Sequence, residues 1–190
     1  MELIKYSYGV NQVSNLKSSF EKTFGLSAVA KSQIFVSDDM PINVANVFSK
    51  DNFLSMITRG SIPCPVKNGT VIEIENWDVP IVWNSNYLPN YSEDSGEITR
   101  RIMMVEFDKI VPPEKKDLLL GQKIKESEFA TFIHRCCTTF LRMSKEHYGK
   151  CVTIFCPEYF LDKKDDIREQ SNKQFSYLKE NTEYCEQSHT

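Results

Sequence analysis

The sequence contains no apolar run near the roughly 18 residues that a membrane-spanning helix needs. Its first residues, Met1 to Lys5, lack the cationic start and the apolar stretch of a signal peptide. A strong charge of either sign is also missing, because the formal net charge is −3. These absences predict an intracellular protein with no membrane partner, in which any contact with nucleic acid is local.

Cysteine pairs of the C-x-x-C type are absent as well, although the chain has six cysteines. Without an export signal, we expect these cysteines to be reduced thiols. The nearest approach to a zinc pattern is His147, Cys151 and Cys156, but the spacings are loose and a fourth ligand is missing. The pattern therefore favours buried or surface thiols over a metal site.

The 190 residues are 41% hydrophobic and 26% charged, which is ordinary for one globular domain, or for one domain and a piece of another. Short apolar runs predict strands, and apolar residues repeating near every 3.6 positions predict helices. Strands mixed with helices indicate the α/β class. The predicted strands are Gln33 to Val36, Val79 to Trp83 and Ile102 to Phe107, and the predicted helices are Asn11 to Phe24, Asn43 to Ile57, Glu126 to His147 and Pro157 to about Leu178.

The helix predicted from Glu126 carries an apolar stripe at helical spacing, and Gly149 can end it. We expect this stripe to pack in the core. The stripe consists of Phe129, Phe132, Ile133, Cys136, Phe140 and Leu141.

A hairpin is predicted around Asn68-Gly69, because both residues of a type I′ turn need positive φ. The first arm runs from Ile62 to Lys67 and the second from Thr70 to Glu75. Two prolines in the first arm cannot donate hydrogen bonds to a sheet, so this arm should be an edge strand or partly irregular.

Two acids, Asp38 and Asp39, directly follow the apolar strand that ends near Val36. In open α/β sheets, ligands bind at the carboxyl ends of the strands. A first carboxylate there can hold Mg²⁺, and a second can polarise an attacking water. The alternative is a turn that ends the strand, since Asp-Asp-x-Pro is also typical of turns.

Asn86 follows the next apolar strand along the chain. Its amide can donate and accept at once, so it can orient both a γ-phosphate and a water. The alternative is that Asn86 caps a turn before Pro89.

Arg100 and Arg101 come directly before the strand predicted from Ile102. A guanidinium at a strand edge can reach a phosphate held by a neighbouring subunit. The alternative is a pair of surface cations.

Lys67 lies beside the predicted hairpin tip, with Lys50 and Arg59 upstream. A lysine on a protruding tip can meet a DNA phosphate as a point charge. The alternative is a solvated tip.

In this order, the motifs resemble the viral superfamily 3 helicases, in the branch of primase-helicases found in large DNA viruses and related phages. The resemblance covers most of the chain, from Phe24 to Phe107 and on into the helical part to about Leu178. Ile34 to Asp39 resembles the Walker B strand, Asn52 to Gly60 with Lys67 the B′ motif and DNA-contacting hairpin, Pro80 to Pro89 motif C, and Gly96 to Phe107 the arginine-finger segment.

This resemblance implies an AAA+-like P-loop NTPase core that assembles as a ring and moves along single-stranded DNA with ATP and Mg²⁺. It also implies work inside the host cell during viral DNA replication. One subunit gives the phosphate loop and the acids, and its neighbour gives the finger. By resemblance, Asp38 holds Mg²⁺, Asp39 helps to activate water, Asn86 senses the γ-phosphate, Arg101 with Arg100 beside it acts in trans, and Lys67 with Arg59 and Asn68 touches DNA.

The phosphate loop of this family, G-x-x-x-x-G-K-[ST], is missing from the sequence. Gly149-Lys150 is followed by Cys151, has Ser144 at the earlier glycine position, and lies after the finger. The family's loop and first strand should precede this chain. We therefore expect a partial ATPase core over residues 1–111 with an exposed sheet edge, a helical extension over 112–180 and a polar tail over 181–190.

Three hypotheses remain open. The chain is a piece of a helicase, inactive until a segment carrying the Walker A loop is supplied. Or it is a non-catalytic protein that keeps the subunit interface and joins or inhibits helicase rings. Or it is an unrelated α/β enzyme or binding module whose acids merely bind a metal.

Overall fold

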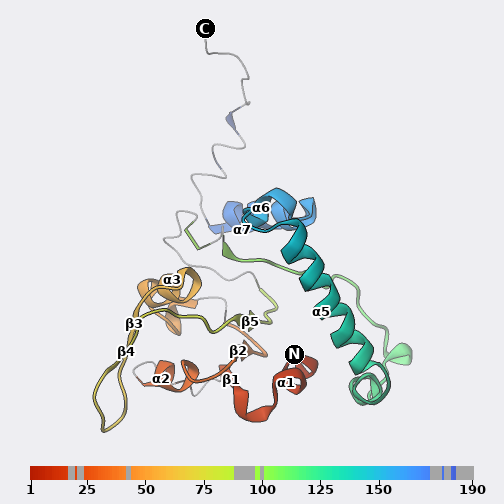
Figure 1. Cartoon of the computed structure of the whole chain (residues 1–190). Helices are drawn as coiled ribbons and strands as arrows, with labels where there is room; N and C mark the ends of the chain where they lie inside the picture. Colours follow the sequence, from red (N-terminus) through yellow and green to blue (C-terminus); the bar gives the residue numbers. More distant parts are fainter. Residues whose placement is uncertain are drawn as a thin grey trace.

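The computed structural model of the chain describes residues 1–16, 20, 24–41, 44–87, 97–98, 101–171, 177 and 181–182. It is a mixed α/β fold with a small parallel sheet, a two-stranded hairpin and several helices (Figure 1). In chain order, the main elements are α1 (Glu2–Tyr8), β1 (Val13–Leu16), α2 (Gly25–Val29), β2 (Ile34–Ser37), α3 (Lys50–Thr58), β3 (Ile62–Cys64), β4 (Ile72–Ile74), β5 (Ile81–Trp83), α4 (Leu120–Lys123), α5 (Phe129–Glu146), α6 (Val152–Phe155) and α7 (Glu158–Ser171).

The parallel sheet has the order β1-β2-β5, so β2 is its central strand. Leu16, Ser37 and Trp83 are register partners across the three strands. All four residues of β2 are buried, as expected for a central strand of a parallel sheet covered on both faces. The predictions of strands ending near Val36 and Trp83 are confirmed.

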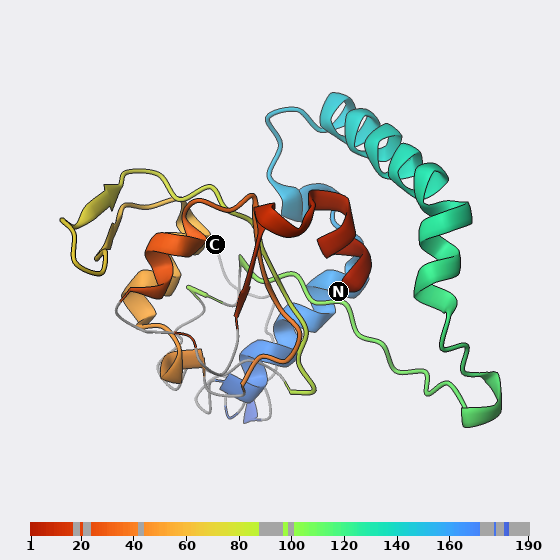
Figure 2. The same ribbon diagram turned by 90° about the horizontal axis from the view of Figure 1, so that it is seen from below.

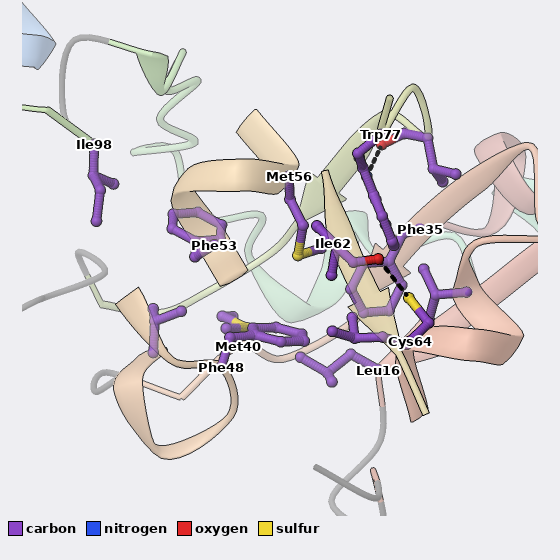
Figure 3. Close-up of a cluster of buried hydrophobic side chains, with 14 residues drawn as sticks. Leu16, Phe35, Met40, Phe48, Phe53, Met56, Ile62, Cys64, Trp77 and Ile98 are labelled. Atoms are coloured by element: carbon purple, nitrogen blue, oxygen red, sulfur yellow. Dashed lines mark hydrogen bonds between the residues drawn. The ribbon is translucent and has the colours of Figure 1, made fainter. Parts of the chain in front are cut away.

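One face of the sheet packs on the main hydrophobic cluster, which Figure 3 shows in close-up. Phe35, which lies in this cluster, is 0% exposed. Trp83 stacks against Phe48 and Phe53, with ring centroids 6.0 and 5.3 Å away. Alternate residues of β2 point to the opposite face and are buried there, which agrees with the period of two in a strand.

The helix predicted from Asn11 to Phe24 is wrong. Val13–Leu16 forms β1 instead, and Gly25 begins α2 rather than ending a helix. Residues 17–19 and 21–23 lie outside the described residues. Pairing of β1 with the buried strand β2 outweighs the local helical spacing, because strand formation depends on neighbours that a local pattern does not contain.

The predicted helix over Asn43 to Ile57, with an irregular middle, is confirmed as a 3₁₀ turn at Val44–Asn46 followed by α3. The side chain of Ser49 caps α3 by accepting from the N–H of Asn52, 3.2 Å away. Phe53 and Met56 of α3 are buried in the main cluster.

The predicted hairpin is confirmed as β3 paired antiparallel with β4. The prediction of a two-residue type I′ turn is wrong, because residues 65–71 separate the two strands. Within residues 65–71, only Asn68 has a positive φ, at 57°. The N–H of Gly69 donates to the carbonyl of Val66 across 3.0 Å, which closes a turn centred on Lys67 and Asn68.

The strand predicted over Ile102 to Phe107 is absent, although residues 102–107 are among those described. The N–H of Glu106 donates to the hydroxyl of Tyr159 across 2.8 Å instead of to a neighbouring strand. Phe107 is 92% exposed. A strand needs a partner with free backbone groups, and the described chain brings none to this segment.

The long helix predicted from Glu126 is confirmed as α5, preceded by a π-helical turn at Ile124–Glu128. Its predicted core packing is wrong, because no residue of α5 is buried. Figures 1 and 2 show α5 at the periphery of the molecule. Its first turn meets α1, where the rings of Tyr6 and Phe129 pack edge to face at 4.8 Å, but its middle is exposed.

The last predicted helix is confirmed in its first part as α7, in which Ile167 is only 2% exposed. Residues 172–176 and 178–180 lie outside the described residues. Within the part of the chain that the structure describes, no helix combines the length and apolarity needed to cross a membrane.

Candidate nucleotide site at the carboxyl edge of the sheet

The segments that follow β2 and β5 run together beyond the sheet. The N–H of Asn84 donates to the carbonyl of Ser37 across 2.9 Å, and the N–H of Met40 donates to the carbonyl of Asn84 across 2.8 Å. The hydroxyl of Ser85 then donates to the carbonyl of Met40 across 2.9 Å. These bonds hold the two strand ends in one fixed arrangement, as expected for neighbouring parallel strands.

This arrangement places Asp38, Asp39 and Asn86 at the same edge of the sheet. The two acids are the first residues after β2, and Asn86 is the third residue after β5. Asp39 and Asn86 are both exposed. Sequence reasoning therefore predicted correctly which strands end in polar side chains, and the sheet order makes those strands neighbours.

Asp38 is held by two partners from the N-terminal part of the chain. Its Oδ2 accepts from the ammonium of Lys5 in α1 and from the amide of Asn15 in β1, the latter across 3.2 Å. The hydrogen bond from Lys5 is the main cause of a lowered pKa of Asp38, and the bond from Asn15 acts in the same direction. Asp38 is therefore an ionised carboxylate at neutral pH.

Lys5 and Asn15 are the site residues that the sequence did not reveal. Lys5 lies 33 residues before Asp38, and no spacing rule links them. Asn15 fell inside a predicted helix, which hid its position at the carboxyl end of β1. Its Oδ1 is buried without a hydrogen-bond partner among the described residues, so the amide is only half satisfied.

The turn after β5 is built by Ser85 rather than by Asn86. Besides donating to Met40, the Ser85 hydroxyl accepts from the N–H of Tyr87 across 3.1 Å. Asn86 is left exposed beside this turn. Pro89, before which Asn86 was expected to act as a cap under the alternative reading, lies outside the described residues.

Within the described part of the chain, Arg101 contacts residues close to it in the sequence. Its guanidinium donates to the carbonyl of Glu97, and its N–H donates to the carbonyl of Ile98 across 2.9 Å. Among the described residues, no hydrogen bond or ion pair joins Arg101 to either acid at the sheet edge. Arg100 lies outside the described residues. A role in a neighbouring subunit stays a prediction.

The predicted DNA contacts lie on the hairpin and at the end of α3. Lys67 and Asn68 are exposed in the hairpin loop, and Arg59 is exposed where it ends α3 with a φ of 59°. Lys50 instead forms an ion pair with Glu97, 3.2 Å apart. The hairpin as a whole is acidic, because residues 61–78 hold one lysine and three acids. Any phosphate contact there is confined to its loop.

A metal ion at this edge would find few protein ligands. The described residues contain no group of three or more His, Cys, Asp or Glu side chains that could hold one. Asp38 is already paired with a cation, the ammonium of Lys5, so a metal ion at this carboxylate would have to take the place of that ammonium. Mg²⁺ suits such a site, since it commonly binds through one or two carboxylates plus phosphate and water.

The other residues considered for metal are arranged differently. The imidazole of His147 stacks on the ring of Phe155 with centroids 4.2 Å apart. Cys151 is exposed, and hydrogen bonds from the hydroxyl and N–H of Thr153 lower its pKa. Cys156 is half-buried.

Comparison with known proteins adds no family. No protein-family model matches the chain, and no curated protein matches it.

Proposed function

We propose that this chain contributes part of a shared ATP site in a ring-forming DNA helicase of viral replication. The chain supplies the carboxylates of Asp38 and Asp39 and the amide of Asn86 to this site, and the helicase moves along single-stranded DNA. The observation that carries the proposal is the joining of the β2 and β5 ends, which puts Asp38, Asp39 and Asn86 at one edge of a parallel sheet. Ligands of open α/β sheets bind at such an edge.

The chemistry follows from the charge state and reach of these side chains. Asp38 is ionised and would hold the Mg²⁺ of Mg-ATP in place of the Lys5 ammonium. When bound, that ion would shield the charge of the phosphates. Asp39 is exposed and would accept the proton of the attacking water. Asn86 would donate to the γ-phosphate and accept from the same water.

The phosphate loop must come from another segment, because the sequence lacks G-x-x-x-x-G-K-[ST]. β5 pairs with β2 on one side, and its other side has no strand partner among the described residues. A strand that adds there in parallel brings its own carboxyl end to the edge that holds the acids.

The test is ATP hydrolysis with and without a complementing polypeptide. The chain alone should show no turnover. Mixed with a superfamily 3 helicase fragment that carries the phosphate loop and ends before the Walker B strand, it should hydrolyse ATP. Asp39→Asn should lower this turnover by about 100-fold or more, the scale of a lost general base.

A matched control is Asp51→Asn, which removes an exposed carboxylate from α3 and should leave turnover unchanged. Turnover by the isolated chain that Asp39→Asn abolishes would contradict the need for a second segment. Turnover in the mixture that tolerates Asp39→Asn would contradict the assigned site.

One observation favours a second candidate, a non-catalytic protein that joins or inhibits helicase rings. Asp38 is already paired with Lys5, so the site has a cation of its own. Lys5→Ala separates the two candidates. It removes the ammonium from Asp38 and should raise turnover in the mixture if the site is catalytic. An inhibitor should still suppress an intact helicase and gain no turnover.

A further inference from the structure

Helix α1 contacts both the parallel sheet and the helical part of the chain, although none of its own residues is buried. Figures 1 and 2 show it between the sheet and the first turn of α5. Toward the sheet, Lys5 pairs with Asp38. Toward the helical part, Glu2 pairs with Lys125, which lies 123 positions away in the sequence. One short helix therefore joins the candidate site to residues far from it.

The contact of α1 with the helical part includes aromatic side chains. The rings of Tyr6 and Phe129 meet edge to face with centroids 4.8 Å apart, and the ammonium of Lys125 lies 5.4 Å from the centre of the Tyr6 ring. Glu2 and Tyr6 are four residues apart, so they share one face of α1. Lys5 lies on the adjacent side, because successive residues of an α-helix are rotated by about 100°. The two contacts are separate but belong to one helix.

Helix α1 is held loosely in its place. Tyr6 is 52% exposed, and an isolated helix of seven residues is marginal in water. Gly9 follows α1 with a φ of 80°, a conformation that glycine adopts readily, and a Cβ added there would meet no atom within 4 Å. Gly9 is therefore an unpacked pivot, and α1 depends on its contacts with Asp38 and α5 for its position.

These two contacts depend on each other. Contacts of Glu2 and Tyr6 with the start of α5 keep Lys5 beside Asp38, because no residue of α1 is buried to anchor the helix by itself. Loss of either contact shifts α1 toward release and so weakens the other. The coupling is reciprocal, so a group that displaces Lys5 also loosens α1 from α5.

We propose that α1 is an autoinhibitory helix, which closes the Asp38 carboxylate with the Lys5 ammonium and is held closed by the start of α5. In the open state, α1 moves away about Gly9, and Asp38 loses the ammonium and can bind the cation of a nucleotide. Asn15 stays on Asp38 in both states, because it belongs to β1. The inhibitory role rests on the ATP site proposed above, whereas the coupling between α1 and α5 does not.

The first experiment measures the opening of α1 in the full-length chain without nucleotide, by hydrogen exchange of the amides of residues 5–9. The N–H of Lys5 donates to the carbonyl of Met1 across 3.2 Å, and the N–H of Gly9 donates to the carbonyl of Lys5 across 3.1 Å. These bonds break when α1 is released and unfolds. Their exchange rates should therefore rise in proportion to the open population.

Two variants weaken the remote contact without changing the sheet edge. Lys125→Met removes the ion pair with Glu2 and the cation beside the Tyr6 ring, and Phe129→Ala removes the ring that Tyr6 meets. Exchange of the α1 amides should rise about threefold in Lys125→Met, the scale of one surface ion pair. It should rise about fivefold in Phe129→Ala, the scale of one aromatic contact.

Matched controls make the same changes outside this contact. Lys123→Met removes a lysine that pairs with Asp117, 2.6 Å away, and Phe140→Ala removes a ring that is 69% exposed farther along α5. Both controls should leave the exchange of the α1 amides unchanged. A rise as large as that in Lys125→Met and Phe129→Ala would overturn the proposal.

The reverse direction tests the coupling itself. Asp38→Asn changes the sheet edge, yet it should move the NMR signals of the Phe129 ring toward those of Tyr6→Ala, in which the ring contact is missing. It should also raise the exchange of the α1 amides about threefold, since the charge that holds Lys5 is lost. Asp51→Asn, the same change at an exposed acid of α3, should do neither.

Exchange that stays the same in both Lys125→Met and Phe129→Ala overturns the proposal, and so do Phe129 signals that ignore Asp38→Asn. In the complemented mixture, Phe129→Ala should raise ATP turnover about fivefold, as it raises opening. An unchanged turnover, while α1 opens, would overturn the inhibitory role. A mixture without any turnover, in a chain whose α1 opens as described, would leave the coupling standing and count against the ATP site.

Discussion

Phe35 shows what a single core residue contributes to this fold. It is 0% exposed and meets the rings of Phe20, Phe48 and Trp83 at 5.9 to 6.2 Å. Phe35→Ala should lower the free energy of unfolding by about 3–5 kcal/mol, from lost burial and the cavity left behind. Urea unfolding followed by tryptophan fluorescence measures this.

Phe107→Ala is the matched control, because Phe107 is 92% exposed. The same atoms are removed there without opening a cavity, so the change should stay within about 0.5 kcal/mol. Equal losses for the two variants would mean that Phe107 is covered in solution.

The Asp38 carboxylate should titrate below its ordinary range because Lys5 and Asn15 donate to it. Its contribution to stability is then present above the unfolded pKa, about 3.9, and is lost as pH falls through the lower folded pKa. More than half of the side chain is exposed, so the contribution is small. Lys5→Met should move the pKa of Asp38 back up, as measured by NMR of the carboxyl carbon.

Asp117 provides the internal control in the same spectra. The hydrogen bond from Lys123 is the main cause of its lowered pKa, so Lys5→Met should leave it in place. An Asp38 pKa that stays low in Lys5→Met would show that Lys5 is not its partner in solution.

At the residue scale, local chemistry was predictable and distant partners were not. Asp38 and Asp39 could be placed at a strand end because a buried apolar run directly precedes them. The pairing of Asp38 with Lys5 joins residues 33 positions apart across two elements, and it depends on where α1 docks. No local pattern contains that information.

At the element scale, the predictions for β2 and α3 held. β2 has a strong apolar pattern and is buried as expected, and α3 forms the predicted helix and buries Phe53 and Met56. The segments over Asn11 to Phe24 and Ile102 to Phe107 failed because a short apolar run becomes a strand only beside a suitable neighbour. β1 gained such a neighbour in β2, and residues 102–107 have none among the described strands.

The hairpin loop gives a prediction for DNA binding. Lys67→Ala should weaken binding of single-stranded DNA in the assembled complex and reduce its salt dependence by about one ion, because one phosphate contact is removed. The acids of the hairpin, Glu73 and Glu75, repel phosphate, and these charge effects are largest at low salt. Fluorescence anisotropy with a labelled oligonucleotide, over a series of salt concentrations, measures both quantities.

Lys116→Ala serves as the control, since this exposed lysine lies outside the hairpin. Equal affinity and equal salt slopes for the unmodified chain and Lys67→Ala would show that the hairpin loop does not contact DNA.

At the scale of the whole molecule, an exposed segment before α4 connects the two predicted parts of the chain, residues 1–111 and 112–180. The two parts nevertheless remain in contact. Residues 105–111 and 113–119 are exposed, and the one helical element among them is a 3₁₀ turn at Pro113–Lys115. Contacts nevertheless cross this segment. Glu2 pairs with Lys125, and Glu106 pairs with Lys163 across 2.6 Å.

Limited proteolysis tests this organisation. Trypsin should cut first after Lys109, Lys115 or Lys116, about tenfold faster than inside α5. A protease binds its substrate as an extended segment, and a helix must unfold locally before it can be cut. The two fragments should still elute together in size-exclusion chromatography, since the two ion pairs and the packing of Tyr6 on Phe129 join them. Fragments that separate without denaturant would show two independent domains, and a first cut inside α5 would show that this helix opens before the connecting segment is reached.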